Sequence, residues 1–201
     1  MKKLSATDYQ TLLPTLGRVG GPAALKSVEA ALASTDVNLA YTGLLALCNW
    51  PGASISDRLI QIATTDEQPA YRNLALKALI RVAPLPDGRT DADRLALTLK
   101  VMGMCKSEAE KKLVVERVRA IRSVEALRFV VPYLDQPAFV PKACETIVEL
   151  AHHRTLREPN KAEFHKALDR VIALSKDPVV LDRANRYKND ETWVRPKVEA
   201  P

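Results

Sequence analysis

Residues 70–83, Ala70-Tyr-Arg-Asn-Leu-Ala-Leu-Lys-Ala-Leu-Ile-Arg-Val-Ala83, align without a gap with residues 138–151, Ala138-Phe-Val-Pro-Lys-Ala-Cys-Glu-Thr-Ile-Val-Glu-Leu-Ala151, at an offset of 68 residues. Both stretches place apolar side chains three and four residues apart, as one face of an amphipathic helix does. A segment that returns at a fixed offset is typical of an array of stacked repeats. We therefore expect a helical repeat protein in which these 68 residues hold two units.

The same pattern extends along most of the chain. Apolar pairs spaced i, i+3 close five helix-patterned runs at Leu16/Val19, Leu47/Trp50, Leu79/Val82, Val118/Ile121 and Ile147/Leu150. Between them lie further amphipathic stretches at 22–33, 53–64, 91–105, 124–134 and 162–174. A pair of such helices is too small to bury its apolar face alone, so neighbouring pairs must stack. The sequence thus predicts an all-α fold, an α-solenoid of about five stacked antiparallel helix pairs forming a HEAT/ARM-like superhelix.

Capping boxes and prolines mark the expected helix ends. In a Ser/Thr-x-x-Asp/Glu box the hydroxyl and the carboxylate satisfy amides of the first turn. Such boxes begin at Ser5, Ser54, Thr90 and Ser107. Near expected helix starts, where a missing N–H costs little, lie Pro22, Pro69, Pro137 and Pro178. Inside helical patterns, where proline is expected to kink or end a helix, lie Pro14, Pro132 and Pro141.

Composition limits the class of protein. The 201 residues are 47% hydrophobic and only 5% aromatic, with 7 glycines and 3 cysteines, which favours helices and excludes a collagen-like, disulfide-rich or disordered chain. The net charge is +6, but basic and acidic residues are interleaved throughout.

Polar residues follow Met1-Lys2-Lys3 where a signal peptide would be apolar, so we expect a cytoplasmic protein, or a periplasmic or secreted one if the chain is part of a larger protein.

One segment links this pattern to a known family. Leu16-Gly-Arg-Val-Gly-Gly-Pro-Ala-Ala-Leu25 resembles the repeat junction of the HEAT-like repeat family, in its short bacterial, phycobilisome-lyase-type form. That junction reads Leu-Gly-x-Ile/Val-Gly followed by Asp/Gly-Pro-x-Ala-Leu. The second helix of the family opens with Asp-x-x-Val-Arg-x-x-Ala, which Asp66 to Ala75 echoes with Arg72. The resemblance covers roughly residues 8–187 and implies the fold, while repeats of this kind serve many functions.

The domain organisation follows from the extent of the repeats. We expect a HEAT-like repeat domain over residues 1–187 and a polar C-terminal tail over residues 188–201, in which Trp193 is expected to dock on the last helix. The expected function is that of a non-catalytic scaffold that binds a protein or peptide partner, either by itself or as a module of a larger protein. Two alternatives stay open: a nucleic-acid-binding protein resembling HEAT-like DNA glycosylases, and a bilin lyase-like or cofactor-binding protein.

The second helix of each pair is expected to present a ladder of side chains along one face. Because Leu79 is a predicted core residue, the opposite face of its helix holds Asn73, Lys77 and Arg81. With the equivalent positions of the other repeats, the predicted partner-binding surface comprises Tyr41, Asn49, Asn73, Lys77, Arg81, Lys112, Glu116, Glu145 and Glu149. The charge of this surface changes along the chain from neutral through basic to acidic, whereas a groove that binds nucleic acid needs positive charge along its whole length. We therefore expect a protein partner, not a nucleic acid or a membrane.

Few residues of the sequence suggest catalysis or metal binding. Glu149, His152 and His153 place a carboxylate and imidazoles on one helix face, but a di-iron site needs a second Glu-x-x-His motif on a facing helix. We therefore expect no metal and no cofactor. The sequence has no Gly-rich phosphate loop, Gly-x-Ser-x-Gly elbow, His-Glu-x-x-His or Cys-x-x-Cys motif, so we expect no catalytic residues. Trp50 and the cysteines Cys48, Cys105 and Cys144 are interpreted as core residues.

Ion pairs are expected to account for most charges between Lys106 and Arg128. Glu108–Lys112 and Lys112–Glu116 have the i, i+4 spacing of neighbours on a helix surface. We therefore interpret this segment as a solvated helix and not as a phosphate-binding stretch.

Overall fold

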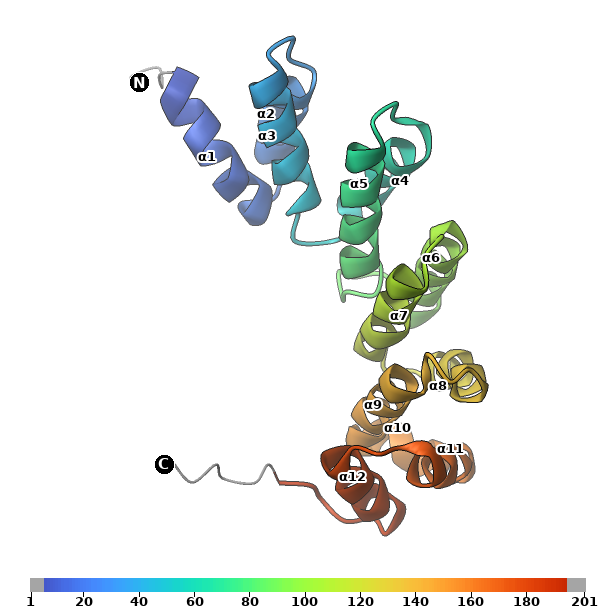
Figure 1. The fold of residues 1–201 in the computed structure, drawn as a ribbon. Coiled ribbons are helices and arrows are strands. Elements are labelled where there is room, and N and C mark those ends of the chain that lie inside the picture. The colour runs from blue at the N-terminus through green and yellow to red at the C-terminus, as the bar shows by residue number, and fades with distance from the viewer. Residues whose placement is uncertain (1–5, 195–201) are drawn as a thin grey trace, which may run out of the picture. The chain divides into compact units, whose positions relative to one another are not determined.

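A computed structural model describes residues 6–194 of the chain, and the side chains from residue 10 onward. No strand occurs among these residues, which confirms the predicted all-α class. The α-helices are α1 (Ala6–Val19), α2 (Pro22–Leu32), α3 (Val37–Cys48), α4 (Ser56–Thr65), α5 (Pro69–Val82), α6 (Asp91–Met104), α7 (Glu108–Arg117), α8 (Val124–Val130), α9 (Val140–His152), α10 (Arg154–Arg157), α11 (Lys161–Leu174) and α12 (Pro178–Lys188) (Figure 1). The 3-10 helices are η1 (Ala53–Ile55), η2 (Val118–Ala120), η3 (Val131–Asp135) and η4 (Glu158–Asn160). Within this described part, no helix has the length and apolar character that a membrane span requires.

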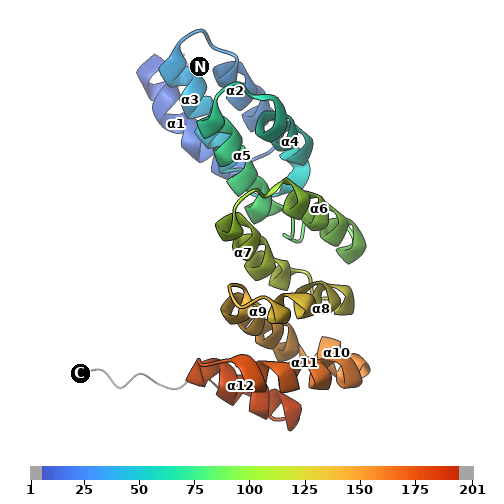
Figure 2. The same ribbon diagram turned by 45° about the vertical axis from the view of Figure 1, so that its right-hand side comes forward.

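The chain divides into two compact units. Unit 1 comprises Met1–Arg89 with Leu97–Lys106, and unit 2 comprises Thr90–Ala96 with Ser107–Pro201. In unit 1, α2 packs on α3 and α4 packs on α5, while α1 packs on α3 and α3 on α5. Helices α1, α3 and α5 therefore form one layer, and α2 and α4 pack against one face of that layer (Figures 1 and 2).

Two glycines set the helix spacing in unit 1. A Cβ at Gly17 of α1 would lie 2.1 Å from the carbonyl oxygen of Ala46 in α3. A Cβ at Gly43 of α3 would lie 2.6 Å from the amide nitrogen of Leu32 in α2. Both distances are shorter than any van der Waals contact, so the backbones meet only because these positions carry no side chain. The Leu-Gly junction that carries the family resemblance thus has a packing role at Gly17.

Unit 2 is built in the same manner from the second half of the chain. Helices α7, α9 and α12 form one layer through the α7–α9 and α9–α12 contacts, and α8 and α11 pack against α9. The fully buried side chains Ile147, Leu150, Phe164, Leu168 and Tyr187 form its core. Burial of these and the other apolar side chains of the unit is its main source of stability, since apolar area removed from water is the dominant favourable term in folding.

One of the predicted capping boxes has both expected bonds, and a second has the bond from the amide to the hydroxyl. Ser107 and Glu110 cap α7 reciprocally, which confirms the box, and the Asp93 amide donates to Thr90 Oγ1 at 3.1 Å at the start of α6. The box at Ser54 is wrong: η1 precedes α4, and Ser54 Oγ instead accepts a hydrogen bond from Trp50 Nε1 at 3.1 Å. The box at Ser5 lies outside the residues whose side chains are described.

The prolines follow the expectation only in part. Pro22, Pro69 and Pro178 open α2, α5 and α12, which confirms their predicted positions. Pro132 coincides with the change from α8 to η3. Helix α1, however, continues through Pro14. Pro141 lies in the first turn of α9, where proline is tolerated, so the predicted kink or end of a helix at this residue is wrong.

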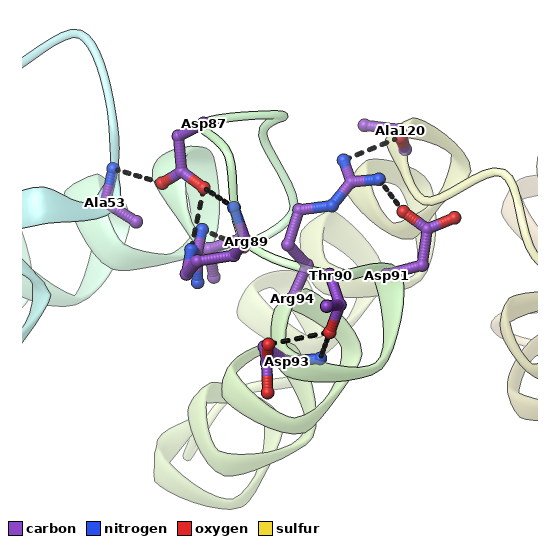
Figure 3. A network of polar contacts seen from close by, with 9 residues as sticks. Ala53, Asp87, Arg89, Thr90, Asp91, Asp93, Arg94 and Ala120 are labelled. Carbon is purple, nitrogen blue, oxygen red and sulfur yellow. Dashed lines mark hydrogen bonds and ion pairs between the residues drawn. The ribbon is translucent and has the colours of Figure 1, made fainter.

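Two polar networks involve the residues just before α6 and the first turn of α6 (Figure 3). In unit 1, the Asp87 carboxylate accepts from the Ala53 amide at 3.3 Å and from Arg89 Nε at 2.8 Å. In unit 2, the buried Arg94 guanidinium pairs with Asp91 and donates to the Ala120 carbonyl oxygen at 3.3 Å. These charged groups satisfy backbone atoms of loops and helix ends, which is a structural role.

Candidate functional site

The predicted ladder residues of unit 1 lie on the α3 and α5 layer. Tyr41, Asn49, Asn73 and Lys77 are exposed, and among the described residues the side chains of Asn49, Asn73 and Lys77 have no hydrogen bond or ion pair. Tyr41 is 42% exposed, and its ring lies 6.0 Å from that of Tyr71 on α5. These four side chains are therefore accessible, and three of them make no polar contact with the described residues.

Arg81 differs from its neighbours on the ladder. It is half-buried, and Nη2 donates to the carbonyl oxygens of Cys48 at 3.0 Å and Trp50 at 2.6 Å. These carbonyls lie at the C-terminal end of α3, where backbone acceptors have no partner within the helix. Arg81 thus holds α3 against α5, so its observed contacts give it a structural role.

Each predicted ladder residue of unit 2 forms an ion pair with a charged residue outside the ladder, on its own helix or on a neighbouring one. Lys112 pairs with Glu108 at 2.7 Å, and Glu116 lies 3.6 Å from Lys142 Nζ, which pairs with Glu145 at 2.8 Å. The predicted pair Glu108–Lys112 is confirmed, whereas Glu116 pairs with Arg119 and Lys142 and not with Lys112. Lys142 therefore links α7 to α9, and the hydrogen bond to Glu145 raises the pKa of its ammonium group.

Glu149 forms the second bridge of this layer, from α9 to α12. Its carboxylate accepts a hydrogen bond from Arg183 Nη1 at 2.5 Å. Burial alone would raise the pKa of Glu149, but the hydrogen bond and charge of Arg183, with Arg119 and His152, bring it below its usual value. The acidic end of the predicted surface is thus neutralised within unit 2.

An aromatic and basic cluster surrounds Arg183. The buried Tyr187 hydroxyl lies 2.9 Å from His152 Nδ1 and 3.3 Å from Arg183 Nε. The Arg183 guanidinium also lies 5.0 Å from the centre of the Trp193 ring, which confirms the predicted docking of that tryptophan on the last helix. The His152 side chain is therefore engaged by Tyr187, and Glu149 by Arg183.

No metal site emerges from these groups. Within the described part of the chain, no three His, Cys, Asp or Glu side chains are placed to hold a metal ion. All three cysteines are free thiols, and burial raises the pKa of Cys48 and of Cys144 to about 11. Both thiols therefore stay protonated near neutral pH, which disfavours a nucleophilic role. Trp50 is 3% exposed, which confirms its interpretation as a core residue.

Sequence reasoning missed the residues that neutralise the ladder in unit 2, chiefly Lys142 and Arg183. A signal was present for Arg183, because it lies 34 residues after Glu149, close to one repeat, and carries the opposite charge. In comparisons with known proteins, no family model and no curated protein matches the sequence. The HEAT-like resemblance thus rests on the repeat pattern, on residues 16–25 and on Asp66 to Ala75 with Arg72.

Proposed function

We propose that this chain is a HEAT-like helical-repeat scaffold, an α-solenoid of stacked helix pairs, that binds a protein or peptide partner on its layer of second helices. The layered packing of each unit supports this proposal. So does a recurring distance along the chain: Arg81 bonds to Cys48, Thr146 to Val115 and Arg183 to Glu149, at separations of 33, 31 and 34 residues. Each of these bonds joins two helices of the same layer at a sequence separation close to the proposed repeat length.

The observation that carries the binding role is the contrast between the ladder residues. Tyr41, Asn49, Asn73 and Lys77 are exposed side chains without polar partners among the described residues, whereas the charged ladder residues of unit 2 are paired internally. Groups that already hold the fold together offer less to a partner, because binding would have to replace existing bonds. We therefore place the partner on α3 and α5, with Tyr41 as an aromatic anchor and Lys77 as a charged contact.

The test is an affinity capture from lysate of the source cell with matched variants. Lys77→Glu reverses a charge on α5, and Lys26→Glu makes the same change at an exposed position of α2 in the same unit. The proposal expects a protein that is retained by wild type and Lys26→Glu and lost with Lys77→Glu. Arg81 is unsuitable for this test, because its removal would also weaken the attachment of α3 to α5.

Three results would contradict the binding proposal. They are a protein captured equally by all variants, recovery of nucleic acid alone, and recovery of a coloured ligand alone. The last two would favour the nucleic-acid and cofactor alternatives.

The solenoid arrangement has its own measurement. A compact chain of this length has a radius of gyration of roughly 16 to 17 Å. Small-angle X-ray scattering of the monomer should give a clearly larger value, because stacked helix pairs extend along one axis. A value at the compact estimate would overturn the solenoid.

A further inference from the structure

A groove with a volume of about 270 Å³ lies in unit 2 between α11 and the segment of α8 and η3. Apolar side chains make its floor: Leu127, Val131, Pro132 and Ala167. Charged side chains complete its lining: Arg128, Glu163, Lys166 and Arg170. Three cations thus face one carboxylate above an apolar surface.

Cross-helix ion pairs fix two of these cations. Arg128 binds Glu163 through two hydrogen bonds, of 2.6 and 2.8 Å, which connect α8 to α11. Arg170 Nη2 binds Asp135 at 2.5 Å, and Nη1 donates to the Val131 carbonyl oxygen at 3.4 Å, which connects α11 to η3. Arg128 also lies 3.6 Å from the Glu125 carboxylate on its own helix. Both guanidinium groups are therefore charge-matched, and together they fix the separation of the helices that form the groove.

Lys166 is the cation that remains. Its side chain is exposed and makes no hydrogen bond or ion pair with any residue that the structure describes. Its charge acts on Glu163 from a distance: the hydrogen bond from Arg128, chiefly, and then the charges of Arg128 and Lys166 hold the pKa of that carboxyl below its usual value. The groove consequently offers one exposed ammonium group that makes no ion pair with the described residues, beside apolar side chains.

Two other surface hollows lack this combination. One, of about 300 Å³ beside Val140 and Val180, is lined by Glu145 and Asp177 against a single cation, Lys176. The other, of about 420 Å³ in unit 1, is lined by Asp87 and Arg89, which bind each other. Excess positive charge over an apolar floor therefore distinguishes the groove between α8 and α11.

We propose that this groove binds a small amphipathic anion, a monocarboxylate whose hydrocarbon chain lies on the Val131 and Ala167 floor while its carboxylate pairs with Lys166. A protein cavity of about 150 Å³ holds benzene, so a groove of this size accommodates a chain of roughly eight carbons. Apolar burial supplies the affinity, and the charge pair fixes which end of the ligand meets Lys166. This site lies on α8 and α11 and is independent of the partner surface on α3 and α5.

The experiment is a titration of the full chain with sodium octanoate, followed by two-dimensional ¹H–¹⁵N NMR. Saturable shifts are expected in α8, η3 and α11, near Leu127, Val131 and Ala167. Propionate has the charge without the chain and 1-octanol the chain without the charge, so both should bind at least about fivefold more weakly. Absence of saturable shifts up to about 10 mM octanoate, or equal binding of either comparison compound, would overturn the proposal.

Variants test the role of Lys166 separately from the fold. Lys166→Glu should weaken octanoate about fivefold or more, because an attraction becomes a repulsion at an exposed site. Lys176→Glu makes the same charge change outside the groove and should leave the affinity within about twofold. Both residues are exposed, so both variants should keep the wild-type NMR spectrum away from the substitution. Wild-type affinity in Lys166→Glu, or an equal loss in Lys176→Glu, would remove Lys166 from the site.

Discussion

Unit 1 and unit 2 hold equivalent helices together by different contacts. In unit 1, α1, α2 and α3 meet through backbone at Gly17 and Gly43, and the ion pair between Arg58 and Glu29 lies on the α2 and α4 side. In unit 2, charged side chains bridge α7 to α9 and α9 to α12, through Lys142 and Arg183. The charged ladder residues of unit 2 are therefore paired within that unit, while in unit 1 the exposed side chains of Asn49, Asn73 and Lys77 make no hydrogen bond or ion pair with the described residues.

The two kinds of contact have different energetic consequences. A glycine at a backbone contact tolerates no added atom, since the neighbouring helix cannot yield without losing its own packing. An ion pair at a partly exposed position is worth much less, because water competes for both charges. We therefore expect unit 1 to be sensitive to volume and unit 2 to be sensitive to charge and pH.

The largest expected effect is that of Gly17→Ala or Gly43→Ala. Each should lower the free energy of unfolding by about 3 kcal/mol, because the new Cβ would collide with the backbone of α3 or α2. Urea unfolding at equilibrium measures the change. Gly103→Ala on α6 is the matched control: no atom lies within 4 Å of its added Cβ, so it should stabilise by up to about 1 kcal/mol. Similar values for all three variants would refute the packing role.

The next effect concerns the bridge between α9 and α12. Arg183→Met should cost about 2 kcal/mol near neutral pH, because it leaves the half-buried Glu149 carboxylate without its partner. The pKa of Glu149 is below its usual 4.5 in the folded protein, so its contribution is complete above that pH and is lost as the pH falls through the folded pKa. The difference between wild type and variant should therefore shrink as the pH falls further below 4.5, through the folded-state pKa.

Paired urea titrations at neutral and acidic pH test this dependence. The double variant Arg183→Met with Glu149→Leu is the control, since it removes both charges and should recover part of the lost stability. A destabilisation that is constant with pH would show that packing of the arginine, and not its charge, matters.

A smaller effect is expected for the buried hydrogen bond between α9 and α7. Thr146 is fully buried, and its hydroxyl donates to the Val115 carbonyl oxygen at 3.0 Å. Thr146→Val keeps the shape and removes the donor, which should cost about 1 kcal/mol in urea unfolding. The equivalent residue of unit 1 is Ala78, which has no such group. An unchanged unfolding free energy would mean that the bond adds nothing to the contact between these helices.

The smallest effect belongs to the exposed pair between Lys112 and Glu108. Lys112→Ala should change the free energy of unfolding by less than about 0.5 kcal/mol, as is usual for an i, i+4 pair on a helix surface. Thermal unfolding at low and high salt checks this, since the difference between variant and wild type should vanish at high salt. A loss above about 1 kcal/mol would show that the contact of Lys112 with the Phe139 ring matters more than the ion pair.

Much of the helical architecture could be predicted from sequence. The amphipathic stretches 91–105 and 162–174 match α6 and α11 within one residue at each end, because apolar spacing and capping act locally. The capping box predicted at Ser54 was wrong. The Ser54 hydroxyl accepts a hydrogen bond from the Trp50 indole instead, and the local sequence pattern does not reveal that partner. Local signals fail where a distant or competing group satisfies the same atom.

The candidate site was less predictable than the fold. Repeat arithmetic placed Tyr41, Asn73 and Lys77 correctly on the exposed side of α3 and α5. The same arithmetic selected Arg81, whose guanidinium instead holds the end of α3. Position on a helix face follows from spacing, whereas the partner of a long side chain depends on which neighbouring helix lies within its reach.

The sequence by itself determined that this protein is all-helical, where most helices begin and end, and which residues form the core, because these depend on apolar periodicity and on short-range capping. The tertiary structure alone decided which charges are bound and which stay open. Glu149 and Lys77 are both charged residues on exposed helix faces in the sequence, yet only Glu149 has an opposite charge within bonding distance. That distinction, and the groove beside Lys166, arise from the packing of helices about 35 residues apart, which local sequence does not encode.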